Sequence, residues 1–277
     1  MKRVILCVVL CSIGASFAQE QKTDSIKRIV KKKSYISIGG TKLSYQDVKT
    51  SNLQYGGLGT NLILGTSRST KDYFWSVNFR ANYSSIKTKV HQGKGNMING
   101  MLAFQYSRKL NTNFTLGGKW NMFEGNLRLF PETGNNSNSV FYNSTLLVVG
   151  GYSRQINDKL KVNFDLGLGL VGLVKESTSF SNYPASQYIL EDGKYDFQNK
   201  KITNAFSLAY FRVAPLFKLN KIEATLSVDY SKRWQLSYNW DLINYRTVKG
   251  YPVTIARHTI GVRFNFINKT KTRINKK

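Results

Sequence analysis

Hydrophobic and polar residues alternate with a period of two along most of the chain after residue 34. In the first six residues of the stretch DLGLGLVGLV, 165–170, leucine occupies alternate positions and aspartate or glycine fills the positions between the leucines. Successive side chains of a β-strand point to opposite faces, so this period predicts strands with one apolar and one polar face. A membrane helix is excluded for this stretch, because about 20 apolar residues are needed to span a bilayer as a helix. The chain is therefore predicted to be all-β.

The alternating segments and their connections follow a regular plan. The predicted strands are 34–45, 52–65, 72–86, 96–109, 112–126, 138–154, 159–175, 203–219, 221–234 and 254–268. Short turns are expected at 67–72, 110–113, 156–159 and 219–221, and longer loops at 46–51, 87–95, 127–137, 176–202 and 235–253. Short turns at one end and long loops at the other are typical of an outer-membrane barrel. The pattern thus predicts a transmembrane antiparallel up-and-down β-barrel of about ten strands, with both termini at the periplasmic end.

A secreted β-sandwich is the soluble alternative, because it has the same period of two. Its strands are typically shorter, and its outward faces carry fewer Phe, Tyr, Trp and Leu side chains. The apolar faces predicted here, together with strands longer than the roughly 9 to 11 residues that cross a membrane, favour the barrel.

The first 18 residues have the features of a secretory signal peptide. Lys2 and Arg3 precede an apolar stretch, and cleavage is expected after Ala18. Both cysteines, Cys7 and Cys11, lie in this segment, so the mature chain is expected to have no disulfide and no thiol nucleophile. We assign residues 19–33 to a basic periplasmic extension, 34–268 to the barrel and 269–277 to a basic periplasmic tail.

The charge is strongly positive, with 41 Lys and Arg against 15 Asp and Glu and a net charge of +26. An exported chain without a nucleic-acid-binding signature has little access to nucleic acid, and the charge is spread along the sequence rather than held in one block. This distribution indicates an anionic environment. Outer-membrane lipids and lipopolysaccharide are therefore the expected partners, and the basic ends would lie on inner-leaflet headgroups.

The last predicted strand carries the most specific local motif. Residues 259–266 read TIGVRFNF, in which Thr259, Gly261, Phe264 and Phe266 fill the polar, glycine and hydrophobic positions. This segment resembles the β-signal of outer-membrane barrels, which implies the barrel assembly machinery as a partner. The basic tail follows it, whereas the commonest form of the signal ends the chain. Over residues 34–268 the pattern resembles the outer-membrane β-barrel proteins of Bacteroidota-type bacteria, which mostly have no defined activity.

The polar faces of the strands would line a narrow lumen, because a barrel of this size is only slightly wider than one that side chains fill. Opposite charges in that space should pair, since an unpaired buried charge is costly. Asp165, for example, is expected to pair with an arginine such as Arg263. A salt-bridged plug is favoured over an open pore. The charged residues assigned to the lumen are Arg80, Lys119, Lys161, Asp165, Arg212, Glu223, Asp229, Arg233, Arg257 and Arg263.

The predicted loop at 235–253 and the adjoining Trp234 concentrate aromatic residues beside cations, a combination that suits sugar rings and phosphates. The candidate ligand contacts are Trp234, Tyr238, Trp240, Tyr245, Arg246 and Tyr251. An aromatic girdle of the kind found in any such barrel is the favoured alternative.

Catalytic chemistry has little support in the sequence. Its two histidines, His91 in a loop and His258 on the outward face of the last strand, stand in no recognisable motif. No cofactor or metal site is expected, because neither histidine has the ligand spacing of a zinc site. The leading hypothesis is a non-enzymatic membrane protein that serves in surface binding, envelope integrity, or as an accessory to transport or secretion. A narrow channel for small solutes is the second hypothesis, and an outer-rim enzyme that modifies lipid A or peptides is the third.

Overall fold

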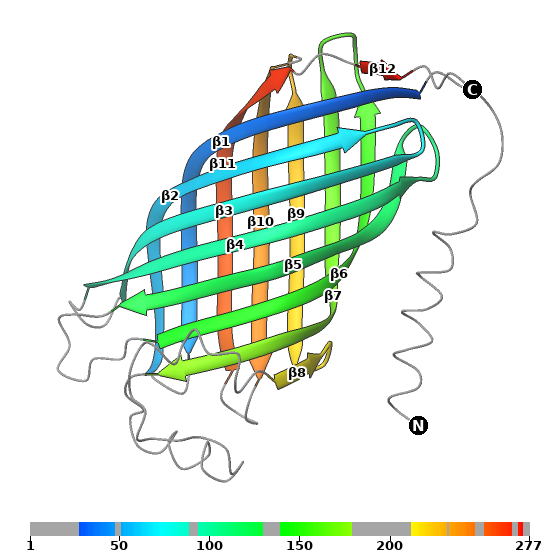
Figure 1. The fold of residues 1–277 in the computed structure, drawn as a ribbon. Helices are drawn as coiled ribbons and strands as arrows, with labels where there is room; N and C mark the ends of the chain where they lie inside the picture. The colour runs from blue at the N-terminus through cyan, green and yellow to red at the C-terminus, as the bar shows by residue number, and fades with distance from the viewer. Residues whose placement is uncertain are drawn as a thin grey trace, which may run out of the picture.

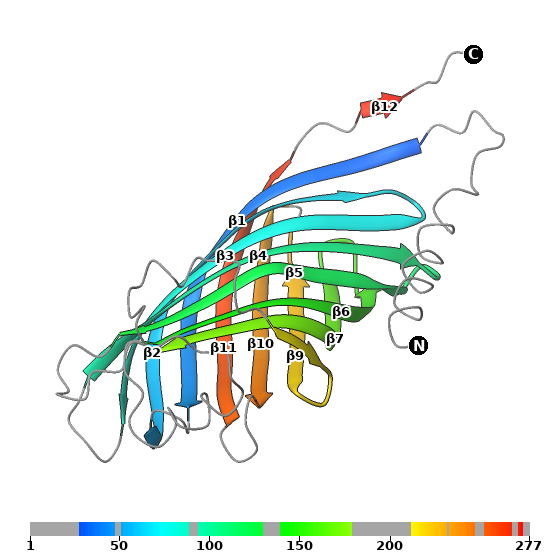
Figure 2. The same cartoon turned by 60° about the horizontal axis from the view of Figure 1, so that its bottom comes forward.

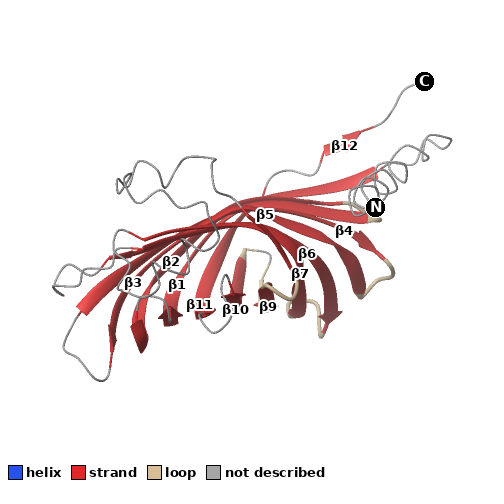
Figure 3. Cartoon of the chain, turned by 90° about the horizontal axis from the view of Figure 1, so that it is seen from below, coloured by secondary structure: helices blue, strands red, loops and turns tan. Residues whose placement is uncertain are grey.

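The computed structural model describes residues 28–47, 51–88, 94–129, 139–178, 212–231, 233–267 and 271–273. These residues form strands joined by short turns, as the colouring of Figure 3 shows. No helix among them is long and apolar enough to cross a membrane. The strands are β1 (Arg28–Asp47), β2 (Ser51–Ser69), β3 (Tyr73–Thr88), β4 (Lys94–Lys109), β5 (Phe114–Leu129), β6 (Ser139–Gln155), β7 (Lys161–Thr178), β8 (Arg212–Pro215), β9 (Leu219–Asp229), β10 (Trp234–Arg246), β11 (Pro252–Ile267) and β12 (Lys271–Arg273).

The strands close into an antiparallel barrel. Each strand from β1 to β7 pairs with its neighbour in sequence, and the sheet continues through β9, β10 and β11. Strand β11 then pairs with β1 from Lys33↔Ile267 to Asp47↔Val253, which closes the ring. In Figure 1 the front strands slope across the more upright β9, β10 and β11 behind them, and Figure 2 shows the same two walls from below. The predicted ten-stranded closed barrel is confirmed.

The strand count is correct, although two of the predicted connections are wrong. Residues 219–221 begin β9 rather than forming a turn, and most of the predicted loop 235–253 is the barrel strand β10. Strand β7 pairs with β8 through Val171–Val174 and with β9 through Lys161–Leu168, so β8 and β9 share one position in the wall. The sequence pattern predicted two separate strands where β8 and β9 form one wall position, and it missed β10. The two errors cancel, so the predicted number of strands is still ten. Residues 203–211 of the predicted eighth strand lie outside the described residues.

Short connections gather at one end of the barrel, which we call the turn end, and the opposite end is the loop end. At the turn end lie residues 70–72, 110–113, 156–160 and 230–233, together with the start of β1 and the end of β11. Asparagine side chains shape two of these turns. The Oδ1 atom of Asn111 accepts hydrogen bonds of 2.8 Å from the amides of Asn113 and Phe114, and Asn157 binds the Lys159 and Leu160 amides at 3.0 and 2.8 Å. Such bonds give the chain a local alternative to the strand ladder.

β1 and β12 extend the fold beyond the predicted barrel boundaries. β1 begins at Arg28, within the segment assigned to the periplasmic extension, and its first residues pair with β12 from the C-terminal tail. The two basic ends of the chain therefore lie side by side at the turn end, as Figure 1 shows.

The outer wall is apolar. Leu166, Leu168 and Leu170 of the opening stretch are exposed, in agreement with the predicted outward face. Similar large apolar side chains are exposed on every long strand of the wall, among them Ile38, Leu64, Phe79, Phe104, Trp120, Val148, Leu226, Leu236 and Ile260. An exposed apolar surface of this extent marks a face that contacts lipid or protein.

Glycine permits close approach where the first and last strands meet. Gly39 of β1 lies opposite Gly261 of β11. A Cβ atom on Gly39 would overlap the carbonyl oxygen of Ile260, so the seam can close at this distance only with glycine at position 39. Gly169 of β7 faces inward, and its missing side chain leaves space for Lys221, whose Cβ would lie 3.1 Å from a Cβ at this position.

Candidate functional site

The centre of the lumen is an ionic layer built around Glu124 of β5. Glu124 is fully buried, and its two carboxylate oxygens receive Lys221 of β9 and Arg257 of β11. The Nδ2 atom of Asn143 donates a further hydrogen bond of 3.2 Å to Glu124. Lys221 and Arg257 are themselves nearly inaccessible to water, with exposures of 1% and 3%. The layer therefore places ionised groups in a site without solvent.

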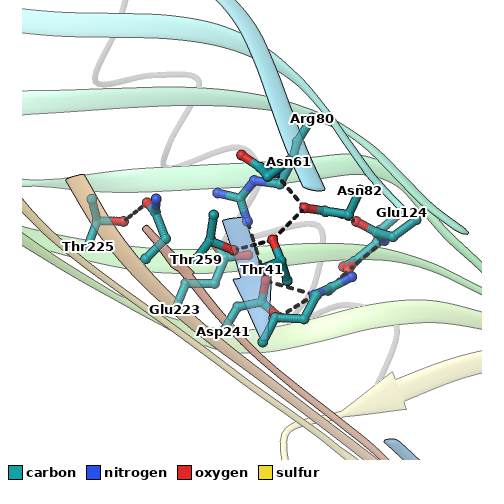
Figure 4. Close-up of polar contacts among 12 residues, drawn as sticks. Thr41, Asn61, Arg80, Asn82, Glu124, Glu223, Thr225, Asp241 and Thr259 are labelled. Atoms are coloured by element: carbon teal, nitrogen blue, oxygen red, sulfur yellow. Dashed lines mark hydrogen bonds and ion pairs between the residues drawn. The ribbon is translucent and has the colours of Figure 1, made fainter. Parts of the chain in front are cut away.

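Two further carboxylates complete this layer, and Figure 4 shows part of it. Asp241 of β10 lies between two arginines: the Nε atom of Arg257 is 2.9 Å from Asp241 Oδ1, and the Nη1 atom of Arg80 is 3.3 Å from Oδ2. Glu223 of β9 pairs with Lys119 and, at 3.3 Å, with Lys221. The Asn121 amide donates to Glu223 Oε1 at 2.7 Å.

Four of these ion pairs cross the lumen, whereas Arg257–Asp241 joins the neighbouring strands β10 and β11 and Lys221–Glu223 lies within β9. Arg80 links β3 to β10, Lys119 links β5 to β9, and Glu124 links β5 to both β9 and β11. Because their charges are buried, each member depends on the others: removing one partner of a buried pair typically costs about 3 to 5 kcal/mol. The lumen is thus filled by side chains that tie opposite walls together.

A ladder of asparagines continues the layer around the wall. Asn61, Asn82, Asn99 and Asn126 lie directly opposite one another on β2, β3, β4 and β5. The Asn82 amide donates to Asn99 Oδ1 at 2.8 Å, and the Asn99 amide donates to Asn126 Oδ1 at 3.0 Å. Arg257 Nη1 joins the ladder to the ionic layer by a 3.0 Å bond to the same Asn126 oxygen. These buried hydrogen bonds link β2, β3, β4 and β5 on the inner face of the wall.

The loop end of the lumen is filled by an apolar layer, although the sequence predicted a polar interior throughout. Ile86, Ile243 and Ile255 have no exposed surface, and they pack with the other members of one buried cluster. The remaining members are Leu43, Tyr45, Met97, Phe141, Val174, Ala214, Leu219, Tyr245 and Val253. Asp47 and Arg128 are buried beside these residues, and the guanidinium carbon of Arg128 lies 5.1 Å from the centroid of the Tyr45 ring. A mainly apolar layer thus lies above the buried ionic layer in this part of the lumen.

The turn end of the lumen is polar and only partly buried. Arg263 lies over the ring of Tyr35, with 4.0 Å between the guanidinium carbon and the ring centroid. Asn163 donates to Asp229 at 3.3 Å. Lys161, Asp165, Asp229 and Arg263 are half-buried here, and none of them forms an ion pair with another described residue. The predicted pair between Asp165 and Arg263 is accordingly not formed.

The predicted lumenal charges thus have different outcomes. Arg80, Lys119, Glu223 and Arg257 lie in the ionic layer, and Lys161, Asp165, Asp229 and Arg263 lie near the turn end. Arg233 is exposed in the turn before β10, and its assignment to the lumen stays a prediction. The side chain of Arg212 lies outside the described side chains.

The sequence reading missed three members of the ionic layer, Glu124, Lys221 and Asp241. Lys221 fell in a predicted turn and Asp241 in a predicted loop. Glu124 was missed because β5 has a β-bulge, where the register shifts between Asn121 and Glu124 and two consecutive residues, Met122 and Phe123, both face outward. A bulge inverts the alternation beyond it. The two adjacent large apolar residues in an otherwise alternating strand were the available signal.

The candidate ligand contacts predicted for a loop lie mostly in the wall. Trp234, Tyr238 and Trp240 are on the outward face of β10, whereas Tyr245 is buried in the apolar layer. Arg246 is exposed at the loop end, and Tyr251 lies outside the described residues. Trp234, Tyr238 and Trp240 therefore belong to the outer surface of the barrel and do not form the predicted surface loop.

His258 is exposed next to these aromatics, with the predicted outward direction. Its Nδ1 atom is 2.7 Å from the hydroxyl of Tyr238. His91 lies outside the described residues. Among the residues that the structure describes, no group of three or more His, Cys, Asp or Glu side chains could hold a metal ion.

The residues of the TIGVRFNF motif have distinct positions at the seam. Thr259 faces inward and its hydroxyl lies 3.0 Å from that of Thr41, while Gly261 lies opposite Gly39. Phe264 and Phe266 face outward, and Phe264 contacts Trp234 with 4.9 Å between ring centroids.

No protein-family model and no curated protein sequence matches the chain. Solved barrels are similar in outline. The translocator domain of autotransporter NalP from Neisseria meningitidis is 8% identical at a TM-score of 0.46, covering 96% of this chain and 98% of its own. The outer membrane protease OmpT from Escherichia coli is 7% identical at a TM-score of 0.46, covering 89% and 99%. The attachment invasion locus protein Ail of Yersinia pestis is 11% identical at a TM-score of 0.33, covering 85% and 99%. Likeness at this level assigns no activity to this chain.

Proposed function

We propose that this chain is an integral barrel of the bacterial outer membrane with a sealed lumen, and that it acts through its surfaces rather than by conducting solutes. The apolar outer wall and the closed sheet support insertion in a membrane, because a spanning sheet must have no open edge. The turn end would face the periplasm and the loop end the outside, as in barrels with short and long connections at opposite ends.

The observation that carries the proposal is the pair of layers across the lumen. A conducting pore needs a hydrated path, and here a buried ionic layer lies beneath a buried apolar one. Opening such a path would separate Glu124 from Lys221 and Arg257. We therefore favour surface binding, envelope integrity, or a role as an accessory to transport or secretion over the narrow channel.

We further propose that the chain is not an enzyme. Among the described residues, the side chain that hydrogen-bonds the ring of His258 is the hydroxyl of Tyr238 rather than a carboxylate. Replacing His91 and His258 together should leave any turnover of a lipid or peptide substrate measured for the wild-type protein unchanged. A loss of turnover in that double variant, with an intact barrel, would instead support the outer-rim enzyme.

Reconstitution tests the proposed function in two steps. The unheated protein should migrate differently from the boiled protein on a denaturing gel, because a closed barrel resists the detergent until heated. Liposomes containing the folded protein should then swell no faster in small sugars or amino acids than liposomes without it. A protein that stays soluble without detergent would contradict membrane insertion, and rapid swelling would support the narrow channel.

A further inference from the structure

The outer wall changes character toward the loop end on the three strands around the seam. Ile38 of β1, Leu236 of β10 and Ile260 of β11 are exposed apolar residues on the turn-end side. Closer to the loop end, beyond the outward Leu242 and Ala256, polar side chains pair on the outer face of β1 with β2 and of β10 with β11. The Gln54 amide donates to Ser44 at 2.8 Å, and the Asn244 amide donates to Thr254 at 3.1 Å. This change marks the border between hydrocarbon and headgroups.

Four outward side chains lie at this border, and we call them the headgroup patch: Lys42, Tyr238, Trp240 and His258. His258 is directly opposite Lys42 on one side and Trp240 on the other. Side chains opposite each other on one face have Cβ atoms about 4.5 to 5.5 Å apart. Tyr238 completes the patch through its hydrogen bond to His258. Lys42, Tyr238 and His258 are all exposed.

We propose that the headgroup patch binds the phosphate of an anionic lipid headgroup in the leaflet at the loop end. Lys42 supplies a positive charge, and a charge-assisted hydrogen bond to phosphate is among the stronger polar contacts. When His258 Nδ1 accepts the Tyr238 hydroxyl, the neutral ring carries its proton on Nε2, which is then a second donor. Tyr238 and Trp240 offer the amphipathic rings that favour the interface.

The surroundings of the patch favour a lipid over a soluble anion. Leu58 of β2 lies opposite Lys42 and is 73% exposed, and Ile260 lies two residues from His258. A headgroup phosphate held by the patch would place its acyl chains along these apolar side chains toward the turn end. The charge of the site and the adjoining apolar surface thus match the two parts of one lipid molecule.

This inference rests on the proposed membrane insertion, and the test is chosen so that the two can fail separately. Detergent-solubilised protein is titrated with dioleoyl phosphatidic acid, dioleoyl phosphatidylcholine or inorganic phosphate, and bound lipid is counted by native mass spectrometry. The heat-modifiable gel shift of every sample reports whether the barrel is intact. The variants are Lys42→Gln, His258→Gln and the double variant, with Lys159→Gln, in an exposed turn at the other end, as the charge-matched control.

We expect phosphatidic acid to bind more tightly than phosphatidylcholine, and Lys42→Gln to weaken that binding by about tenfold, the usual scale for loss of a charge-assisted bond. His258→Gln should weaken it less, the double variant most, and Lys159→Gln should bind as the wild type does. Equal affinities in the wild type and the double variant, both with an intact gel shift, would overturn the patch while leaving the barrel untouched. Equally tight competition by inorganic phosphate would overturn the lipid as the ligand.

Discussion

Glu124 of β5 contacts side chains from three other strands. Its carboxylate pairs with Lys221 of β9 and Arg257 of β11 and accepts a hydrogen bond from Asn143 of β6. Glu124→Gln keeps the size of the side chain but removes its charge, so Lys221 and Arg257 lose a neutralising partner in a site without water. We expect the free energy of unfolding to fall by about 3 to 5 kcal/mol, the usual cost of breaking a buried ion pair.

Urea unfolding of the barrel in lipid vesicles measures this loss. Asp158→Asn, in an exposed turn, is the matched control and should change stability by less than about 0.5 kcal/mol. Equal unfolding midpoints for Glu124→Gln and the wild type would show that the ionic layer does not stabilise the barrel.

Gly39 and Gly40 provide a second comparison at the scale of single residues. A Cβ at position 39 would overlap the backbone of β11, whereas a Cβ at position 40 would lie 4.0 Å from its nearest neighbour, the Gly59 oxygen. Gly39→Ala should therefore reduce the fraction of chains that show the heat-modifiable shift, and Gly40→Ala should fold as the wild type does. Similar folded fractions for the two variants would mean that the seam does not need the close approach at Gly39.

Among the elements, β5 depends on its bulge. Met122 is the extra residue at the register shift between β4 and β5, because Phe123 pairs with Leu102 and Asn121 with Ala103. Deleting Met122 would leave a regular strand in which Asn121 and Glu124 still face inward. Deleting Gly125 would instead turn Asn126 and Arg128 toward lipid, because the side-chain period of a strand is two.

We therefore predict that the chain lacking Met122 forms a heat-modifiable barrel, and that the chain lacking Gly125 does not. Refolding yields of the two deletion variants, measured by the same gel shift, test which residues of β5 face the lumen. A folded Gly125 deletion would contradict the inward assignment of Asn126 and Arg128.

The same element shows where sequence reasoning succeeds and where it ends. An unbroken alternation, as in β3 or in the first half of β7, is sufficient to identify the strand and its lumenal face, so Arg80 was placed correctly. In β5 the bulge moves the inward side chains from odd-numbered to even-numbered positions. A bulge is defined by pairing with the neighbouring strands, which the alternation within β5 alone does not reveal. Glu124 was lost for this reason.

Strand β10 escaped detection for a different reason. Its residues Trp234–Arg246 carry alternating polarity, but aromatic residues and cations close together also fit a ligand-binding loop. The pairing of β10 with β9 and β11 shows that the segment is a strand and not a loop. This pairing joins residues that are distant in sequence, so the local pattern of residues does not reveal it. The ion pair of Asp241 with Arg80, from β10 to β3, could not be anticipated until β10 itself was known.

At the scale of the whole molecule, three zones lie along the lumen. The turn end is polar and partly open to water, the centre is ionic and buried, and the loop end is mainly apolar and buried, with Asp47 and Arg128 among its apolar side chains. On the outer face the same strands carry exposed apolar side chains over much of their length, and near the seam they become polar toward the loop end. This arrangement makes the wall an anchor and leaves the surfaces at its two ends for binding.

The central claim is that the ionic and apolar layers seal the lumen, and single-channel recording tests it most directly. Purified, heat-modifiable protein is inserted into a planar bilayer and held at voltages of both signs in potassium chloride. A sealed lumen predicts a baseline current equal to that of the protein-free bilayer throughout. Reproducible steps of steady conductance at low voltage, each appearing with an insertion event, would contradict it.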